Sequence, residues 1–140
     1  MNLIIRHFLE KDYEEAVLIW ERCLITIGIS DSKAEILKFL EKNSISCFAA
    51  EEKDALVGTV LGGFDGRRGL VHHLAVLPEY QGKGIGKALM YKLEETFKKM
   101  GVVKINFWVE NRNLKVTDFY RKLGYELRDD IITMSKTFWE

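Results

Sequence analysis

The stretch LPEYQGKGIGKALM, residues 77–90, limits the folds that this chain can adopt. Apolar residues recur with helical spacing from position 84 to position 100, and a strand-like apolar run at 69–77 comes before them. The segment therefore joins the end of a strand to the start of a helix. Three glycines fall within five positions of this junction and lysines lie beside them: Gly82, Gly84, Gly86, Lys83 and Lys87.

A strand-to-helix junction of this composition is suited to an anion. The first turn of a helix presents unpaired N–H groups and a partial positive charge, and successive loop amides form an anion-binding concavity. Glycine allows a bulky anion to approach those amides, and Lys83 and Lys87 add positive charge. The pattern predicts a bound phosphate or pyrophosphate. The alternative is that the glycines only form a tight turn.

Two familiar nucleotide motifs do not fit the spacing. A P-loop needs glycine at position 81 and Ser or Thr at position 88, where the chain has Gln81 and Ala88. A dinucleotide fingerprint needs a third glycine at position 87, which is Lys87. These mismatches argue against a nucleotide-binding protein.

The flanking sequence predicts an α+β fold in one domain, residues 1–140. The strand-like segments are 2–8, 45–52, 55–64, 69–77, 103–109, 125–130 and 131–138, and the helical ones are 10–25, 32–42, 84–100 and 113–123. Ser32 and Glu35 form a capping-box pattern, and Lys53-Asp54 marks a hairpin turn. Strand 69–77, its helix and strand 103–109 form a parallel crossover unit. We expect a mixed, mostly antiparallel sheet of about seven strands with one central parallel pair.

Composition excludes several partners. Lys plus Arg and Asp plus Glu both number 21, so no net charge attracts nucleic acid or an acidic membrane. No apolar run approaches the roughly 20 residues of a membrane span, and the first residues lack a signal-peptide core. Cys23 and Cys47 have no metal-binding spacing. We expect a cytoplasmic protein that holds no metal.

The glycine segment resembles a known motif. Gln81-Gly82-Lys83-Gly84-Ile85-Gly86 is similar to the pyrophosphate loop of the GNAT superfamily of N-acetyltransferases, and residues 74–80 resemble the strand before that loop. A second family signature resembles the positions Asn113, Val116, Phe119-Tyr120 and Gly124-Tyr125. Within the superfamily, the chain is similar to small bacterial proteins related to the ribosomal-protein N-terminal alanine acetyltransferases.

This resemblance implies a fold, a co-substrate and a set of contacts. The GNAT fold has about four helices around a sheet whose two parallel strands splay apart, and acetyl-CoA lies in the gap. The implied cofactor-binding residues are Leu74, Ala75 and Val76 for the pantetheine arm, Gln81, Gly82, Lys83, Gly84, Ile85, Gly86 and Lys87 for the pyrophosphate, and Asn113 and Tyr120 near the thioester. The implied reaction moves acetyl directly to a primary amine, of a protein N-terminus or a small molecule, through a ternary complex. The alternative is a non-catalytic acyl-CoA-binding module. Family members commonly form homodimers.

The sequence matches the catalytic residues of the family less completely. Tyr120 is the implied acid for the departing thiolate, although it also fits the apolar face of its helix. Relatives place a glutamate base at the positions of Trp108 or Leu70, so this chain departs from both patterns. Alternation along the strand places either His72 or His73 toward the acceptor, and the register favours His72. A structural histidine, or a base acting through water, is the alternative.

Overall fold

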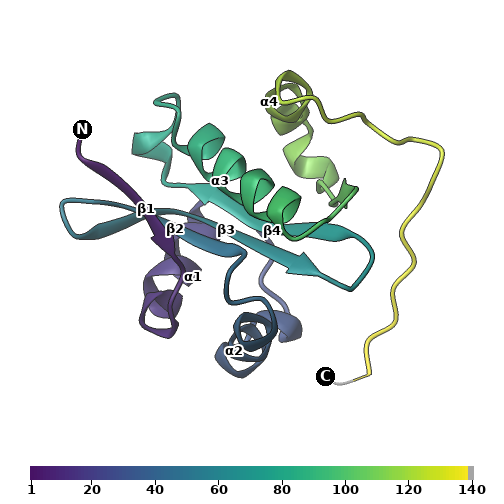
Figure 1. Cartoon of the computed structure of the whole chain (residues 1–140), viewed down its shortest axis with the longest axis horizontal. Coiled ribbons are helices and arrows are strands. Elements are labelled where there is room, and N and C mark those ends of the chain that lie inside the picture. Colours follow the sequence, from purple (N-terminus) through teal and green to yellow (C-terminus); the bar gives the residue numbers. More distant parts are fainter. Residues whose placement is uncertain (139–140) are drawn as a thin grey trace. The chain divides into compact units, whose positions relative to one another are not determined.

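The computed structural model describes residues 1–138 of the 140-residue chain. Residues Met1–Phe107 form one compact unit, and the residues from Trp108 onward form a second. The first unit holds the whole sheet (Figure 1). A single domain over residues 1–140 stays a prediction.

Four α-helices and five strands occur within residues 1–138, as the predicted α+β class requires. The first unit contains, in order, β1 (Leu3–His7), η1 (Glu10–Asp12), α1 (Tyr13–Arg22), η2 (Ile29–Asp31), α2 (Lys33–Lys42), β2 (Cys47–Glu52), β3 (Ala55–Phe64), β4 (Gly69–Val76), η3 (Pro78–Tyr80), α3 (Ile85–Lys99) and β5 (Ile105–Asn106), where η denotes a 3-10 helix. The second unit contains η4 (Asn111–Val116) and α4 (Thr117–Lys122).

The sheet follows chain order, β1-β2-β3-β4-β5. The first four strands pair antiparallel, and β4 with β5 is the parallel pair that the sequence predicts. Local contacts and backbone conformations fix the start of α2 and the turn between β2 and β3. The Ser32 side chain accepts a hydrogen bond from the Glu35 amide and begins α2, and Lys53 and Asp54 both adopt positive φ in the β2–β3 turn.

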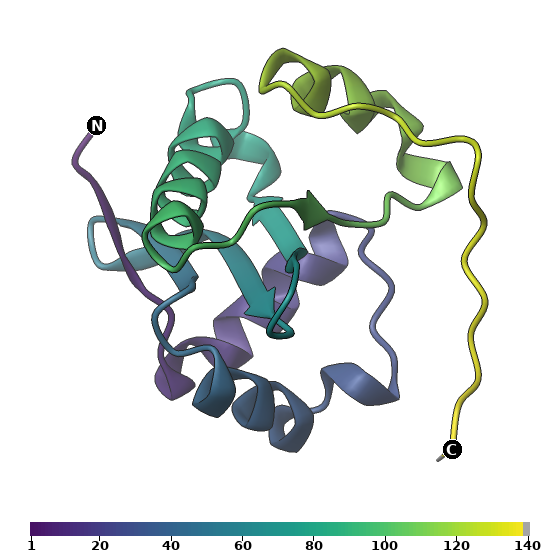
Figure 2. The ribbon, with the colours of Figure 1, turned by 45° about the vertical axis from the view of Figure 1, so that its right-hand side comes forward.

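Helices cover both faces of the sheet (Figure 2). Side chains alternate along a strand, so neighbouring positions of β3 face opposite layers. A Cβ added at Gly62 would clash with Leu93 of α3, whereas one added at Gly63 would lie 2.9 Å from Phe39 of α2. The α1–α2 layer buries Trp20 completely, and the α3 layer buries Leu93 completely. β3 and β4 are therefore held between two apolar layers.

The expectation of about seven strands is not confirmed. Residues 125–138 form no strand, and the predicted strand 103–109 is reduced to Ile105–Asn106. A strand needs a neighbour for its backbone groups and a surface for its apolar side chains. Ile132 is 88% exposed and Met134 is 89% exposed, so alternating apolar residues alone do not make a strand here. The predicted helix 113–123 begins instead as η4, where Asn113 leaves the helical conformation.

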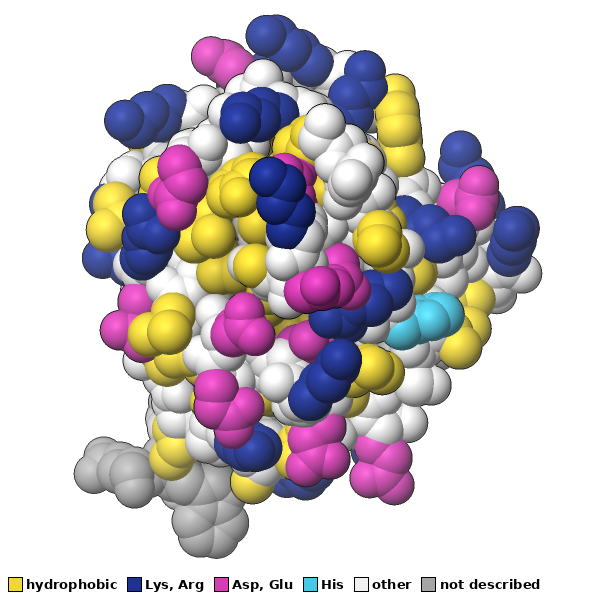
Figure 3. Space-filling view, turned by 90° about the vertical axis from the view of Figure 1, so that its left-hand side faces the viewer, with side chains coloured by type: hydrophobic (Ala, Val, Ile, Leu, Met, Phe, Trp, Pro, Cys, Tyr) yellow, Lys and Arg dark blue, Asp and Glu magenta, His cyan; other side chains and the backbone are white. Residues whose placement is uncertain are grey.

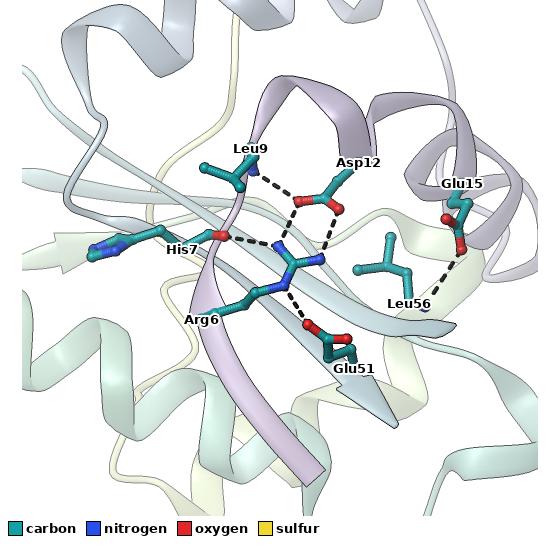
Figure 4. Close-up of polar contacts among 7 residues, drawn as sticks. All are labelled: Arg6, His7, Leu9, Asp12, Glu15, Glu51 and Leu56. Atoms are coloured by element: carbon teal, nitrogen blue, oxygen red, sulfur yellow. Dashed lines mark hydrogen bonds and ion pairs between the residues drawn. The ribbon is translucent and has the colours of Figure 1, made fainter. Parts of the chain in front are cut away.

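An arginine joins β1 to the start of α1 (Figure 4). Arg6 donates to both carboxylate oxygens of Asp12, at 2.8 and 2.9 Å, and its Nε donates to Glu51 at 2.6 Å. Asp12 also accepts from the Leu9 amide. Burial acts to raise the pKa of Asp12, but the hydrogen bonds from Arg6 and Leu9 outweigh it and hold that pKa below its ordinary value. The fold depends on Asp12 being charged.

We predict that Arg6→Met lowers the free energy of unfolding by about 2 kcal/mol at pH 7, because it leaves a buried carboxylate unpaired. The side chain of Arg6 is 24% exposed, which keeps this loss below that of a fully buried pair. Because the folded pKa of Asp12 is depressed, its contribution is present above the unfolded pKa and is lost as pH falls through the folded pKa. The difference between wild type and variant should therefore shrink below about pH 4 in urea titrations.

Arg22→Met is the matched control for this test. Arg22 and Glu79 form an ion pair whose side chains are both 51% exposed, so solvent already screens it. This variant should move the urea midpoint little at either pH. Equal losses from the two substitutions would show that the Arg6 network does not stabilise the fold.

Candidate functional site

One edge of β4 is largely without a strand partner. On its β3 side, β4 is paired from Gly69 to Val76. On its β5 side, pairing within the described residues is limited to Gly69 with Ile105 and Leu70 with Asn106. Within residues 1–138, no strand pairs with residues 74–76 on this side. An extended ligand can pair with such an edge as an added strand does.

The same part of β4 carries a bulge. Thr59 faces Ala75 and Leu61 faces His72, so two residues, His73 and Leu74, lie opposite the single residue Val60. His73 has φ +49°. A left-handed conformation in a non-glycine residue costs on the order of 1–3 kcal/mol and persists only where its surroundings enforce it.

A buried hydrogen-bond chain enforces this bulge. The Trp20 indole donates to the Thr59 hydroxyl at 2.9 Å, and that hydroxyl donates to the His73 carbonyl at 2.8 Å. Trp20 and Thr59 are both completely buried. α1 thus fixes the conformation of β4 through one side chain of β3.

The bulge interrupts the strand alternation from which the sequence analysis inferred that only one of the two histidines can face the acceptor. The His73 ring lies 4.5 Å from the Trp20 ring of α1, and the His72 ring meets Phe39 of α2 edge-on at 5.4 Å. The two imidazoles are only 6.5 Å apart. Both therefore lie on the same face, because the extra residue at the bulge interrupts the alternation of a regular strand.

The two histidines have different partners. His73 Nε2 lies 2.6 Å from Asp31 Oδ1, and the other Asp31 oxygen accepts from the Gly28 amide at 2.9 Å. Burial acts to raise the pKa of Asp31, but the hydrogen bonds from His73 and Gly28 outweigh it and hold that pKa below its ordinary value. Burial, followed by the neighbouring His73, lowers the pKa of His72. The charged form of His72 is therefore disfavoured, while His73 has a carboxylate beside it.

The glycine turn after β4 has the geometry of an anion site. Gly82 and Gly84 have φ +79° and +85°, and a Cβ added at either would meet nothing within 4 Å. Ala88 donates the first helical hydrogen bond of α3, to Gly84, so the amides of residues 85–87 precede the internal ladder of the helix. The turn leaves these amides open to an anion, and the pyrophosphate contacts stay a prediction. Gln81 donates to the Val76 carbonyl at 2.9 Å and so joins the turn to the end of β4.

Cys23 is a contact that the sequence did not predict. Its thiol donates to the same Val76 carbonyl at 3.2 Å, and burial raises its pKa. A raised pKa disfavours the nucleophilic thiolate, so Cys23 supports the end of β4 rather than carrying acetyl. No sequence spacing links positions 23 and 76.

The predicted residues Asn113 and Tyr120 lie in the second unit. The Asn113 amide donates to the Glu110 carbonyl at 2.8 Å. The Tyr120 ring contacts the rings of Phe119 and Tyr125, and burial raises the pKa of its phenol to about 12. Tyr120 is therefore protonated at any physiological pH.

Comparison with known proteins identifies the family. The model of the acetyltransferase (GNAT) family matches residues 5–125, which include β4, the glycine turn and α4. This chain belongs to the GNAT acetyltransferase family.

Relatives of nearly full length support this assignment. An acetyltransferase of Sodalis glossinidius is 36% identical over 136 residues, which are 97% of this chain and 96% of the relative. An acetyltransferase of Yersinia enterocolitica is 37% identical over 128 residues, 91% of each chain. The chain is therefore an acetyltransferase.

Solved GNAT structures share its fold. Ard1 from Thermoplasma volcanium superposes with a TM-score of 0.83 at 22% identity, covering 91% of this chain and 85% of its own. The PaiA N-acetyltransferase from Thermoplasma acidophilum, solved in complex with coenzyme A, gives a TM-score of 0.80 at 22% identity and covers 92% of each chain. At this identity the likeness concerns the fold.

The surface and composition add little to the choice of ligand. On the face drawn in Figure 3, basic and acidic side chains are interspersed. Between residues 1 and 138, no helix has the length and apolarity to cross a membrane. Within those residues, no group of three or more His, Cys, Asp or Glu side chains is placed to hold a metal ion.

We predict that Gly84→Ala weakens coenzyme A binding at least tenfold, as measured by calorimetric titration. The added methyl group would project into the open space beside the α3 amides, where the pyrophosphate is expected. Alanine at positive φ should cost about 1 kcal/mol of stability, which leaves the fold intact.

Gly66→Ala provides the matched control. Gly66 has φ +96°, and a Cβ added there also meets nothing within 4 Å, but it lies in the turn between β3 and β4. This variant should lose similar stability and keep its affinity for coenzyme A. Equal affinities in the two variants would remove the glycine turn from the binding site.

Proposed function

We propose that this chain transfers acetyl from acetyl-CoA directly to a primary amine, in a ternary complex without an acetyl-enzyme intermediate. The observation that carries the proposal is the continuity of two features. The free edge of β4, residues 74–76, leads through η3 into the glycine turn of residues 81–87. The strand edge can pair with the amide-rich pantetheine arm, and the glycine turn can hold the pyrophosphate that follows this arm.

The proposed contacts are those implied by the family motifs. We assign the pantetheine to the backbone of Leu74, Ala75 and Val76. Residues 81–87 would hold the pyrophosphate, and Asn113 would contact the remainder of the co-substrate.

The acceptor is proposed from chemistry and from neighbouring structures. One similar structure is an N-acetyltransferase solved with coenzyme A, and another, AAC(6')-Iy, was solved with the bisubstrate analogue CoA-S-monomethyl-acetylneamine. Both names support an amine acceptor. A protein N-terminus and a small-molecule amine both agree with the open β4 edge.

The reaction requires three groups from the protein. The neutral amine attacks the thioester carbon, and the resulting oxyanion needs an N–H donor, for which we propose a backbone amide at or near Val76. The C–S bond then breaks and the thiolate takes a proton, for which we propose Tyr120. The ammonium form of the amine must first lose a proton, and His72 is the candidate base that the sequence suggested.

The acid step has an energetic cost that the site must offset. Proton transfer from a phenol of pKa about 12 to a thiolate whose conjugate acid has a pKa near 8.5 is uphill by roughly 5 kcal/mol. Burial also raises the pKa of a thiol. When the thiolate leaves within a water-excluded site, the difference between its pKa and that of Tyr120 is therefore smaller. Tyr120 can then act as an acid only on a desolvated thiolate.

Thiol release from acetyl-CoA, measured across a set of primary amines, tests the proposed activity. At least one amine should increase the release well above hydrolysis without amine, with an N-acetyl product of the expected mass. Binding of coenzyme A without turnover on peptide, polyamine or aminoglycoside acceptors would favour the non-catalytic acyl-CoA-binding module.

For the acid, we predict that Tyr120→Phe lowers kcat by roughly 10²-fold, a typical contribution of one proton-transfer group. The ring remains, so the melting temperature should change little. Tyr125→Phe removes a neighbouring hydroxyl from the same ring cluster and should keep kcat within a few-fold. If both variants lose the same activity, the Tyr120 hydroxyl has no specific role as an acid.

A further inference from the structure

The pair formed by His73 and Asp31 is not explained by the family motifs. Asp31 ends η2, between α1 and α2, and lies 42 positions before His73 in the chain. The side chains are 15% and 13% exposed, so the pair is mostly buried but still reached by solvent. A buried ion pair often adds little to the stability of a fold, so we consider a functional role for this pair.

The chemistry of the pair fixes the tautomer of His73. The pKa of Asp31 is held below its ordinary value, so its carboxylate is ionised and can only accept hydrogen bonds. The His73 Nε2 that lies 2.6 Å from it must therefore carry a hydrogen. In the neutral imidazole the lone pair is then on Nδ1. A histidine arranged in this way can accept a proton at Nδ1 while the carboxylate stabilises the resulting cation.

Several contacts hold this arrangement in place. The Tyr13 hydroxyl donates to the Asp31 carbonyl at 2.6 Å, and the Gly28 amide donates to Asp31 Oδ2. On the other side, the Trp20 ring packs against the imidazole and the Thr59 hydroxyl fixes the His73 carbonyl. The pair is therefore oriented from both α1 and β3.

His72 is a weaker candidate base. Its ring is packed edge-on against Phe39, and burial disfavours its charged form. A carboxylate is bonded to His73, whereas the pKa of His72 is lowered further by the neighbouring His73. His73 also directly precedes residues 74–76, which we assign to the pantetheine arm.

We propose that His73, oriented by Asp31, is the base that takes the proton from the acceptor amine; this rests on the proposed function. The ammonium N–H bond breaks and its proton binds His73 Nδ1. The freed lone pair of the amine nitrogen then forms the bond to the thioester carbon. The nitrogen is then cationic in the tetrahedral intermediate and releases its second proton to water. The C=O bond reforms as the C–S bond breaks, and the C–S electron pair stays on sulfur, which takes its proton from Tyr120. The imidazolium, stabilised by Asp31, returns its proton to water after transfer.

Two ionisable groups lie beside the His73 ring. Asp31 of η2 contacts its Nε2, and the His72 ring of the same strand lies 6.5 Å away. Tyr13 of α1 reaches the Asp31 carbonyl rather than the imidazole, and Trp20 of α1 carries no charge. Substitution of Asp31 or His72 should therefore affect the pH profile in different ways.

The test measures kcat/KM against pH for the full chain, with acetyl-CoA and the amine that wild type acetylates fastest. His73→Gln should lower kcat/KM at least tenfold and remove the acid limb of the profile. Asp31→Asn keeps the shape of the side chain but removes the charge of the carboxylate. It should therefore move the acid limb to lower pH and reduce the plateau value of kcat/KM. His72→Gln removes the base that the sequence suggested, and under this proposal it should keep the limb.

Two further measurements separate catalysis from folding and from the proposed function. Coenzyme A affinity and melting temperature identify any variant that has lost its structure, and repeating the profile with a second amine of different pKa separates the ionisation of the amine from that of the enzyme. Loss of the limb in His72→Gln with its retention in His73→Gln would overturn the assignment, as would an unshifted limb in folded Asp31→Asn. Failure of wild-type acetyl transfer would instead contradict the proposed function.

Discussion

The hydrogen bond from the Thr59 hydroxyl to the His73 carbonyl is the contact on which the arrangement of β4 depends. Because Trp20 donates to the same hydroxyl, one helix, one strand and the bulge are held as a unit in a region that excludes water. The bulge turns both histidines toward α1 and α2, and it directly precedes residues 74–76 on the edge that β5 does not cover. The proposed binding of acetyl-CoA and the proposed proton transfer both use this one irregularity.

Local features of the fold could be predicted from the sequence. The capping contact of Ser32 with Glu35, the positive φ of Lys53-Asp54 and the glycine turn before α3 each depend on residues within a few positions of one another. The crossover from β4 through α3 to β5 follows from residue spacing and the usual handedness. In the candidate site, the glycine turn is the feature that the sequence described best, because its chemistry is carried by backbone amides.

Features that depend on distant residues could not be predicted. The bulge requires Thr59 and Trp20, and the partner of His73 is supplied by Asp31 from another segment. Regular alternation therefore does not hold for His72 and His73, whose rings lie on the same face of the sheet. The strands predicted within residues 125–138 do not form for a related reason. Alternating apolar side chains make a strand only where a neighbouring strand forms hydrogen bonds with their backbone.

The central claim, that the free edge of β4 and the glycine turn together hold acetyl-CoA, is tested most directly by NMR. Amide 15N–1H spectra of this 16.2 kDa protein can be recorded during titration with acetyl-CoA. The account predicts that the largest shifts occur at residues 74–76 and 82–87, with little change in the hairpin turn at 65–68. Saturable binding that leaves residues 74–76 unshifted would contradict it.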